Sequence, residues 1–161
     1  MRGASEPGAA LDEADLLRRA RAARERAYAP YSGFRVGAAV ALEDGRVFEG
    51  ANIENASYSL SVCAERVALH SYAAGGLQVP VVALAVVGDG DDPCPPCGAC
   101  RQVIFEFGPD AIVYSSGDGG RPLVTSIRQL LPHPFGPRRL AQGFGDPENE
   151  LDQLPPVDWR A

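Results

Sequence analysis

The densest chemistry in this sequence lies in Pro96-Cys97-Gly98-Ala99-Cys100-Arg101-Gln102 and, earlier in the chain, in Cys63-Ala64-Glu65-Arg66. Catalytic zinc sites use three protein ligands and leave a fourth position to water, whereas structural zinc sites are closed by four. The three thiols of Cys63, Cys97 and Cys100 therefore predict a catalytic zinc site. Glu65, two residues after the first thiol, suits a base beside the water better than a fourth ligand.

Other cysteine sites share parts of this pattern. Cys97-x-x-Cys100 alone also occurs in redox motifs and zinc ribbons. With Cys94 the spacing resembles part of an iron–sulfur run, although no further cysteine follows three residues later. The addition of Cys63-Ala64-Glu65 favours the catalytic zinc site, and Cys94 is interpreted as a small loop residue.

Charged neighbours refine this prediction. Three thiolates around Zn²⁺ leave a formal charge of −1, which weakens the metal as a Lewis acid. A guanidinium that donates to the sulfurs restores positive character, so we expect Arg66 to lie behind the ligands; the alternative is a solvent-facing helix residue. His70 and His133 lack metal-ligand spacing and are interpreted as structural residues.

Composition limits the class of protein. The chain has 161 residues, of which 45% are hydrophobic and 22% charged, as expected for one globular domain. It has no apolar run of membrane-spanning length and no apolar leader, so the expected location is the cytoplasm. The net charge is −6, and all 15 basic residues are scattered arginines, which argues against nucleic acid as a partner. A small uncharged substrate is expected.

Periodicity and turn residues predict a first helix over 11–27, followed by strands over 34–42 and 46–52 that are joined by a turn at 43–45. After a loop over 52–58, they predict a helix over 63–74, a buried strand over 79–87 and a helix over 97–107. The last predicted elements are a strand over 111–114, a loop over 115–120 and a short helix over 127–131 capped by Ser126. This order predicts a three-layer α/β/α fold, with a mixed sheet that starts with a β-hairpin and is covered by helices. Both cysteine stretches then begin helices, where the helix dipole favours thiolates. We expect one domain over 1–140 and a poorly ordered acidic tail over 141–161.

Five separated motifs resemble those of the small, homotetrameric cytidine deaminases, a family of zinc-dependent nucleoside deaminases. The motifs are the two cysteine stretches and residues 28–39 (Tyr-Ala-Pro-Tyr-Ser-Gly-Phe-Arg-Val-Gly-Ala-Ala), 52–58 (Asn-Ile-Glu-Asn-Ala-Ser-Tyr) and 130–135 (Leu-Leu-Pro-His-Pro-Phe). The resemblance extends from about the first helix to Gly136. Ala51 stands where many relatives have a further cysteine, and that position is not a ligand.

The resemblance implies roles for individual residues. One Zn²⁺ per subunit is held by the three cysteines, and Glu65 transfers protons. Asn52 and Glu54 hydrogen-bond the ribose hydroxyls, while Phe34 lies against the pyrimidine. The remaining implied substrate contacts are Tyr58, which helps to close the site, Ala64, and Phe135, which reaches the site of a neighbouring subunit of the homotetramer.

The implied reaction is hydrolytic deamination of cytidine and 2′-deoxycytidine in pyrimidine salvage. One alternative is a deaminase of another aminopyrimidine nucleoside, such as a blasticidin S deaminase-like enzyme, although Asn52-Ile53-Glu54 favours an ordinary ribose. A second is a non-catalytic metal-binding or iron–sulfur module. No phosphate-cradling loop is evident, which disfavours a nucleotide substrate.

Overall fold

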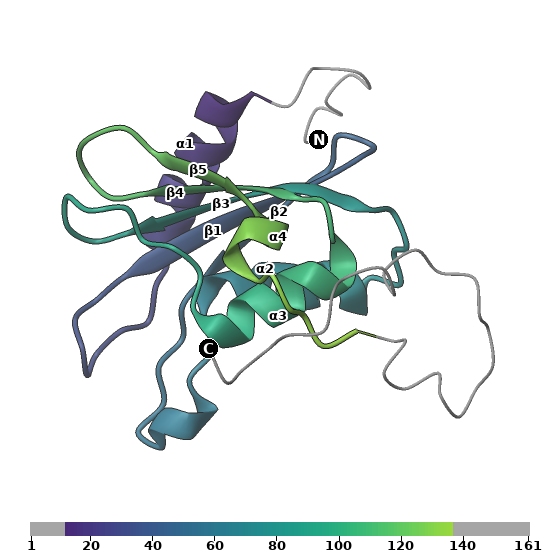
Figure 1. Ribbon diagram of the computed structural model, residues 1–161. Helices are drawn as coiled ribbons and strands as arrows, with labels where there is room; N and C mark the ends of the chain where they lie inside the picture. Colours follow the sequence, from purple (N-terminus) through teal and green to yellow (C-terminus); the bar gives the residue numbers. More distant parts are fainter. Residues whose placement is uncertain (1–11, 137–161) are drawn as a thin grey trace, which may run out of the picture.

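A hairpin of β1 (Val36–Leu42) and β2 (Val47–Ala51) begins a five-stranded sheet (Figure 1). The structure is a computed structural model that describes residues 12–136. The strand order is β2-β1-β3-β4-β5, where the later strands are β3 (Val81–Gly88), β4 (Ile112–Ser116) and β5 (Leu123–Ser126). Only β3 and β4 pair in parallel within this sheet; its other neighbours are antiparallel. The sheet is therefore mixed, as predicted.

Helices cover both faces of the sheet (Figure 1). One face carries α1 (Glu13–Arg24), and the other carries α2 (Ala64–Ala74) and α3 (Gly98–Phe107). The short α4 (Ile127–Leu130) packs beside α3, and a single 3₁₀ turn, η1 (Tyr58–Leu60), lies between β2 and α2. Parallel strands need a crossover, and α3 supplies it between β3 and β4. The predicted three-layer α/β/α architecture is confirmed.

Side chains of β1 alternate between two cores, as the period of a strand requires. Val40 and Leu42 are fully buried among residues of α2 and α3, while Ala39 and Ala41 are fully buried under α1. The face under α1 is lined by small residues, so that helix lies close to the sheet. At Gly37 the approach is closest, since a Cβ there would overlap the carbonyl oxygen of Ala20.

Turn and cap residues confirm several local predictions. Gly45 closes the hairpin at a φ of +84°, which glycine adopts without steric cost. Ser126 caps α4 in a capping box with Gln129, as its position predicted. Asp12 caps α1 by accepting a hydrogen bond from the amide of Ala14 at 3.0 Å. The acidic start of this helix thus combines a cap with favourable charge near the dipole.

Some element boundaries differ from the prediction. The strand β5 was not predicted, because it has only four residues and exposes Leu123 and Val124. β4 continues through Ser115 and Ser116, which the sequence assigned to a loop; both serines are buried against neighbouring strands. α1 ends at Arg24 instead of Ala27, where the chain turns into the bridge at Tyr28.

The expected tail over 141–161 lies outside the described residues, and the domain boundary at residue 140 stays a prediction. Within residues 12–136 no helix combines the length and the apolar character that a bilayer crossing requires.

Candidate metal centre

Two helix N-termini bring the three predicted ligands together. Cys63 is the N-cap of α2, Cys97 is the N-cap of α3, and Cys100 is buried in the first turn of α3. The three sulfur atoms lie within 4.8 Å of one another, and the sulfurs of Cys63 and Cys97 are 3.9 Å apart. In the described part of the chain, no other group of His, Cys, Asp and Glu is arranged to share a metal ion. The predicted three-thiol cluster is thus formed, without a fourth side chain.

The local electrostatics favour a thiolate in this cluster. A hydrogen bond with Cys100, assisted by Arg66 and Cys97 and opposed by burial, lowers the pKa of Cys63 to about 5. The same hydrogen bond and burial raise the pKa of Cys100. Cys63 is therefore the thiol that gives up its proton most readily, and a bound cation favours thiolates as ligands. The donor set fits Zn²⁺, which thiolates bind in tetrahedral sites.

Glu65 follows Cys63 in the first turn of α2 and is only 4% exposed. Burial raises the pKa of its carboxyl group, and the negative charge of Cys63 adds to this, while the neighbouring Cys100 thiol acts in the opposite direction. A carboxyl group in such surroundings can hold a proton and release it. Glu65 is beside the cluster without being one of its members.

Arg66 lies behind the cluster. Its Nη2 donates to the carbonyl oxygen of Ser61 at 3.2 Å and is 3.8 Å from the sulfur of Cys63. The pKa of the guanidinium is raised, chiefly by its hydrogen bond to Cys63, so the group remains a cation. The contact between Arg66 and a ligand sulfur that the sequence predicted is therefore present.

Asn52 and Glu54 have structural partners that the sequence did not reveal. Asn52 accepts a hydrogen bond from the amide of Val36 at 2.8 Å and donates to the carbonyl oxygen of Phe34 at 2.9 Å. Glu54 accepts from the amide of Tyr31 at 2.8 Å and from both the amide and the hydroxyl of Ser32. The hydroxyl of Ser32 is the main cause of the lowered pKa of Glu54. Both side chains therefore hold the segment that carries Phe34.

Phe34 is 45% exposed and its ring lies against Gly88. A Cβ on Gly88 would be 3.0 Å from Cζ of Phe34 and 2.9 Å from the sulfur of Cys94. Burial raises the pKa of Cys94 to about 11, and the charges of Glu65 and Cys63 add to the shift. Cys94 is thus a protonated thiol near the metal centre and not one of its ligands, in agreement with the sequence interpretation.

The other candidate residues differ in surroundings. Tyr58 is 71% exposed in η1, with its ring edge-on to Tyr31 at a centroid distance of 5.9 Å. Ala64 is fully buried, whereas Phe135 is 58% exposed. The backbone of Phe135 is bound on both sides to Gln102 of α3, by its amide at 3.1 Å and its carbonyl at 2.6 Å. The backbone of Phe135 is therefore held by hydrogen bonds, while its side chain is exposed.

Two histidines were interpreted as structural residues from their spacing. His70 and His133 are both exposed, and neither joins the metal cluster.

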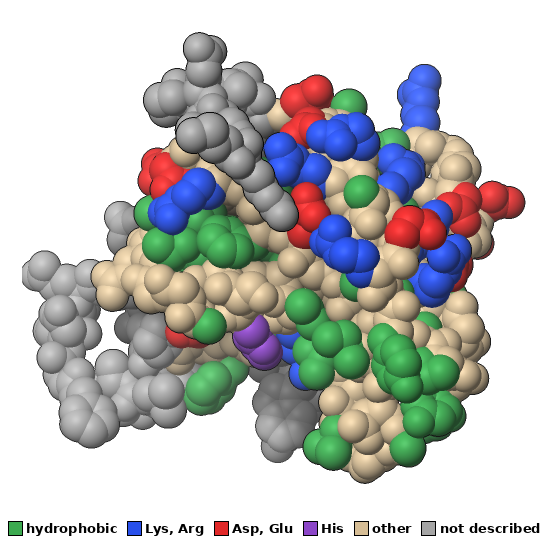
Figure 2. Space-filling view, turned by 180° about the vertical axis from the view of Figure 1, so that it is seen from behind, with side chains coloured by type: hydrophobic (Ala, Val, Ile, Leu, Met, Phe, Trp, Pro, Cys, Tyr) green, Lys and Arg blue, Asp and Glu red, His purple; other side chains and the backbone are tan. Residues whose placement is uncertain are grey.

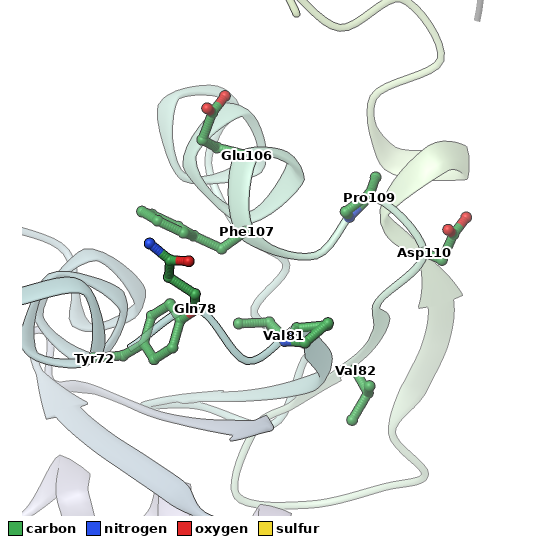
Figure 3. A pocket seen from close by; sticks show the side chains of 9 residues that line it. Tyr72, Gln78, Val81, Val82, Glu106, Phe107, Pro109 and Asp110 are labelled. Carbon is green, nitrogen blue, oxygen red and sulfur yellow. The ribbon is translucent and has the colours of Figure 1, made fainter. Parts of the chain in front are cut away.

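A separate cavity of about 510 Å³ lies at the opposite end of α3 (Figure 3). Its lining includes Tyr72, Gln78 and Phe107, together with Glu106 and Asp110. It shares no lining residue with the cluster, and a ten-residue helix, about 15 Å long, separates Phe107 from Cys97. This cavity is distinct from the metal centre.

Comparison with known proteins agrees with this site. The family model for the cytidine and deoxycytidylate deaminase zinc-binding region matches residues 11–116. A cytidine deaminase from Halalkalibacterium halodurans is 50% identical over 126 residues, which cover 78% of this chain and 95% of the relative. The crystal structure of cytidine deaminase from Burkholderia pseudomallei has a TM-score of 0.74 at 51% identity, covering 78% of this chain and all of that one. That of Mycobacterium tuberculosis has a TM-score of 0.66 at 38% identity, covering 79% and 99%.

The chain therefore belongs to the zinc-dependent cytidine and deoxycytidylate deaminase family. Its similarity extends over nearly the full length of cytidine deaminases of that family, not over the zinc motifs alone.

Proposed function

We propose that this protein catalyses the zinc-dependent hydrolysis of cytidine and 2′-deoxycytidine to uridine and 2′-deoxyuridine with release of ammonia, a reaction of pyrimidine salvage. The observation that carries this proposal is the pairing of a three-thiol cluster with the buried carboxyl group of Glu65. Three ligands leave one zinc position to a small molecule. A second candidate, a non-catalytic metal module, gives no reason for an acid beside the cluster.

Cys63, Cys97 and Cys100 would hold Zn²⁺, which when bound lowers the pKa of water to about 7. Glu65 takes the proton that water loses and gives it to ring N3 of the pyrimidine, which makes C4 a better electrophile. The oxygen of that water adds to C4. The same carboxyl group then takes the remaining proton from this oxygen and gives it to the 4-amino group. The C4–N bond breaks as the C4 carbonyl forms, and ammonia leaves. Burial raises the pKa of Glu65, which favours the protonated carboxyl group that must carry the proton between the two transfers.

Arg66 would offset the charge that three thiolates impose on the metal. Its distance of 3.8 Å from the sulfur of Cys63 supports this role. A cation behind the ligands withdraws electron density from the sulfurs and keeps the metal a stronger Lewis acid.

Asn52 and Glu54 would bind the ribose hydroxyls, Phe34 would lie against the base, and Ala64 and Tyr58 would complete the pocket. Asn52 keeps one N–H and one lone pair after its two hydrogen bonds to the backbone. Glu54 has a lowered pKa and is an anion able to accept from hydroxyl groups. A sugar that lacks these hydroxyls would leave the polar groups unpaired, which costs affinity.

We infer a homotetramer in which the exposed ring of Phe135 enters a neighbouring subunit's site. Exposed apolar side chains gather over the loop that carries η1, at the lower right of Figure 2; they are Tyr28, Tyr31, Ile53, Tyr58 and Leu60. Such a patch is typical of a protein interface. By contrast, arginine and acidic side chains are interspersed over the α1 side, which gives no basic stripe on that side for nucleic acid (Figure 2). The cytoplasmic location stays a prediction from sequence.

Purified, zinc-analysed protein should be assayed by the ultraviolet absorbance change as cytosine becomes uracil. The panel consists of cytidine, 2′-deoxycytidine, their monophosphates, adenosine and blasticidin S. Turnover of the two cytosine nucleosides with little turnover of the rest would support the proposal. Preference for blasticidin S would instead favour the alternative aminopyrimidine deaminase, and failure on every compound would contradict a nucleoside deaminase. Light scattering measures the oligomeric state independently.

A further inference from the structure

Arg24 occupies an unusual place for an arginine. It lies in the last turn of α1, and its side chain is only 10% exposed. Its backbone rests on β1, because a Cβ on Gly37 would overlap the amide nitrogen of Arg24. The helix that carries the guanidinium is therefore packed directly on the sheet, and it cannot come closer to β1.

The guanidinium of Arg24 joins two loops. Nη1 donates to the carbonyl oxygen of Gly88 at 2.8 Å and lies 2.6 Å from Oδ1 of Asp118. It is also 3.5 Å from Oδ1 of Asp89. Gly88 ends β3 and Asp118 follows β4, so one cation holds together the ends of two parallel strands. Charge-assisted hydrogen bonds of this kind are the strong ones in proteins.

The carboxyl partners extend this contact along the loop after β3. The other oxygen of Asp118 accepts from the amide of Gly90 at 3.1 Å, and the Asp118 amide donates to the carbonyl of Gly90 at 2.6 Å. Asp89 accepts from the amide of Arg35 at 2.8 Å, while its own amide donates to the carbonyl of Arg35 at 3.0 Å. These hydrogen bonds join Arg35, which follows Phe34, to Asp89, which follows Gly88.

The same loop forms the surface under Phe34 and leads to a metal ligand. The ring of Phe34 and the side chain of Cys94 both lie against Gly88. Cys97 follows Cys94 by three residues and begins α3. A shift of the Gly88 carbonyl would therefore displace the Phe34 ring more directly than it displaces the thiol cluster, which Arg24 does not contact.

We propose that Arg24 is a positioning residue for the substrate pocket, which acts through Gly88 and Asp118 to fix the ring of Phe34. This inference rests on the proposed function, because it takes Phe34 as the contact for the base. The hydrogen bond and ion pairs of the Arg24 guanidinium involve neither the metal cluster nor Glu65. Its removal should thus impair nucleoside binding while the zinc and the proton-transfer group stay in place.

The decisive variant is Arg24→Lys, which keeps the charge but lacks the terminal nitrogen, Nη1, that reaches both the Gly88 carbonyl and Asp118. We expect KM for cytidine to rise about tenfold with kcat within about twofold, as for misplacement of a binding group away from the chemistry. The dissociation constant for uridine, measured by calorimetry, should rise by a similar factor. The matched control is Arg18→Lys in the same helix, whose side chain is 67% exposed and pairs only locally with Asp15.

A merely structural role predicts a different result. Loss of folded protein lowers kcat at unchanged KM and leaves the affinity of the remaining molecules for uridine intact. That result, or wild-type values throughout for Arg24→Lys, would overturn the proposal. If Arg24→Lys does not fold, Asp118→Asn tests the same contact and should raise KM and the uridine dissociation constant together. Wild-type protein that neither deaminates cytidine nor binds uridine would contradict the proposed function itself.

Discussion

Gly50 of β2 lies directly under Ala64, the first residue of α2. A Cβ on Gly50 would overlap the carbonyl oxygen of Ala64 and come within 2.6 Å of the amide nitrogen of Ala68. The sheet and the first turn of the helix therefore meet backbone to backbone. Because Cys63 and Glu65 flank Ala64, this contact sets the height of the metal centre above the sheet.

Gly50→Ala should displace that first turn. Overpacking at such a site costs about 1–3 kcal/mol, so we expect a lower melting temperature and a lower zinc content. Thermal unfolding and elemental analysis measure the two effects. Gly136→Ala is the matched control, since a Cβ there meets only Cε1 of Phe105 at an ordinary 4.0 Å. Equal melting temperatures for the two variants would show that α2 can shift to accommodate a methyl group at residue 50.

Glu65→Gln should keep the fold and the zinc but lose turnover. Glutamine has nearly the shape of the buried acid and cannot shuttle a proton, and general acid–base catalysis contributes about 10²–10⁴ in rate. Steady-state kinetics on metal-analysed protein provide the measurement. A fully metal-loaded variant with wild-type kcat would remove Glu65 from the mechanism.

Cys97→Ala and Cys94→Ala form a pair that separates a ligand from a neighbour. The first should release zinc, because two thiolates and no replacement side chain remain in the cluster. The second should retain the metal, because Cys94 is outside the cluster. Elemental analysis after gel filtration distinguishes them, and zinc loss in both would mean that Cys94 is a ligand after all.

Arg66→Gln should reduce kcat about 10- to 100-fold, the usual effect of removing an outer-shell partner of a metal site. The cause is the charge lost near the sulfur of Cys63. Arg46→Gln serves as the control, since Arg46 pairs with Asp44 at the exposed hairpin turn. Identical kinetics for both variants would mean that Arg66 does not act on the metal.

Asp118→Asn should lower stability at neutral pH and have less effect in acid. The hydrogen bond from Arg24 holds the pKa of Asp118 below its ordinary value of 3.8. A carboxyl group whose pKa is lowered on folding stabilises the protein above the unfolded value, and this contribution is lost as pH falls through the folded value. The difference in melting temperature between wild type and variant should therefore shrink below about pH 3.8. A difference that is constant down to pH 2 would contradict an ionic contact.

Strong local patterns were enough to predict most of the fold. The continuous apolar run of β3 and the glycine turn before β2 are local signals, and both are where the sequence predicts them. The strand β5 was missed because its four half-exposed residues have no distinctive period. It is a strand because it pairs with β4, for example Tyr114 with Val124. The residues of β5 alone do not reveal this pairing.

The metal centre was predictable for a similar reason, since ligand identity and spacing are written into short motifs. The contacts of Arg24 were not, because its partners Gly88 and Asp118 are far away in the chain and it resembles the other arginines of α1. The backbone contacts of Asn52 were also hidden, because an amide that binds a sugar and an amide that braces a loop look the same in a sequence.

Asn52 gives this arrangement a further consequence. Its side-chain amide already binds the carbonyl of Phe34 and the amide of Val36, on either side of Arg35. A sugar hydroxyl that pairs with the remaining N–H and lone pair would therefore also hold this backbone in place. Asn52 would then contact the sugar of a nucleoside and also position the ring of Phe34, which contacts the base. Trimming the sugar should loosen the hold on the base, and a free pyrimidine should be a far poorer ligand than its missing contacts alone would suggest.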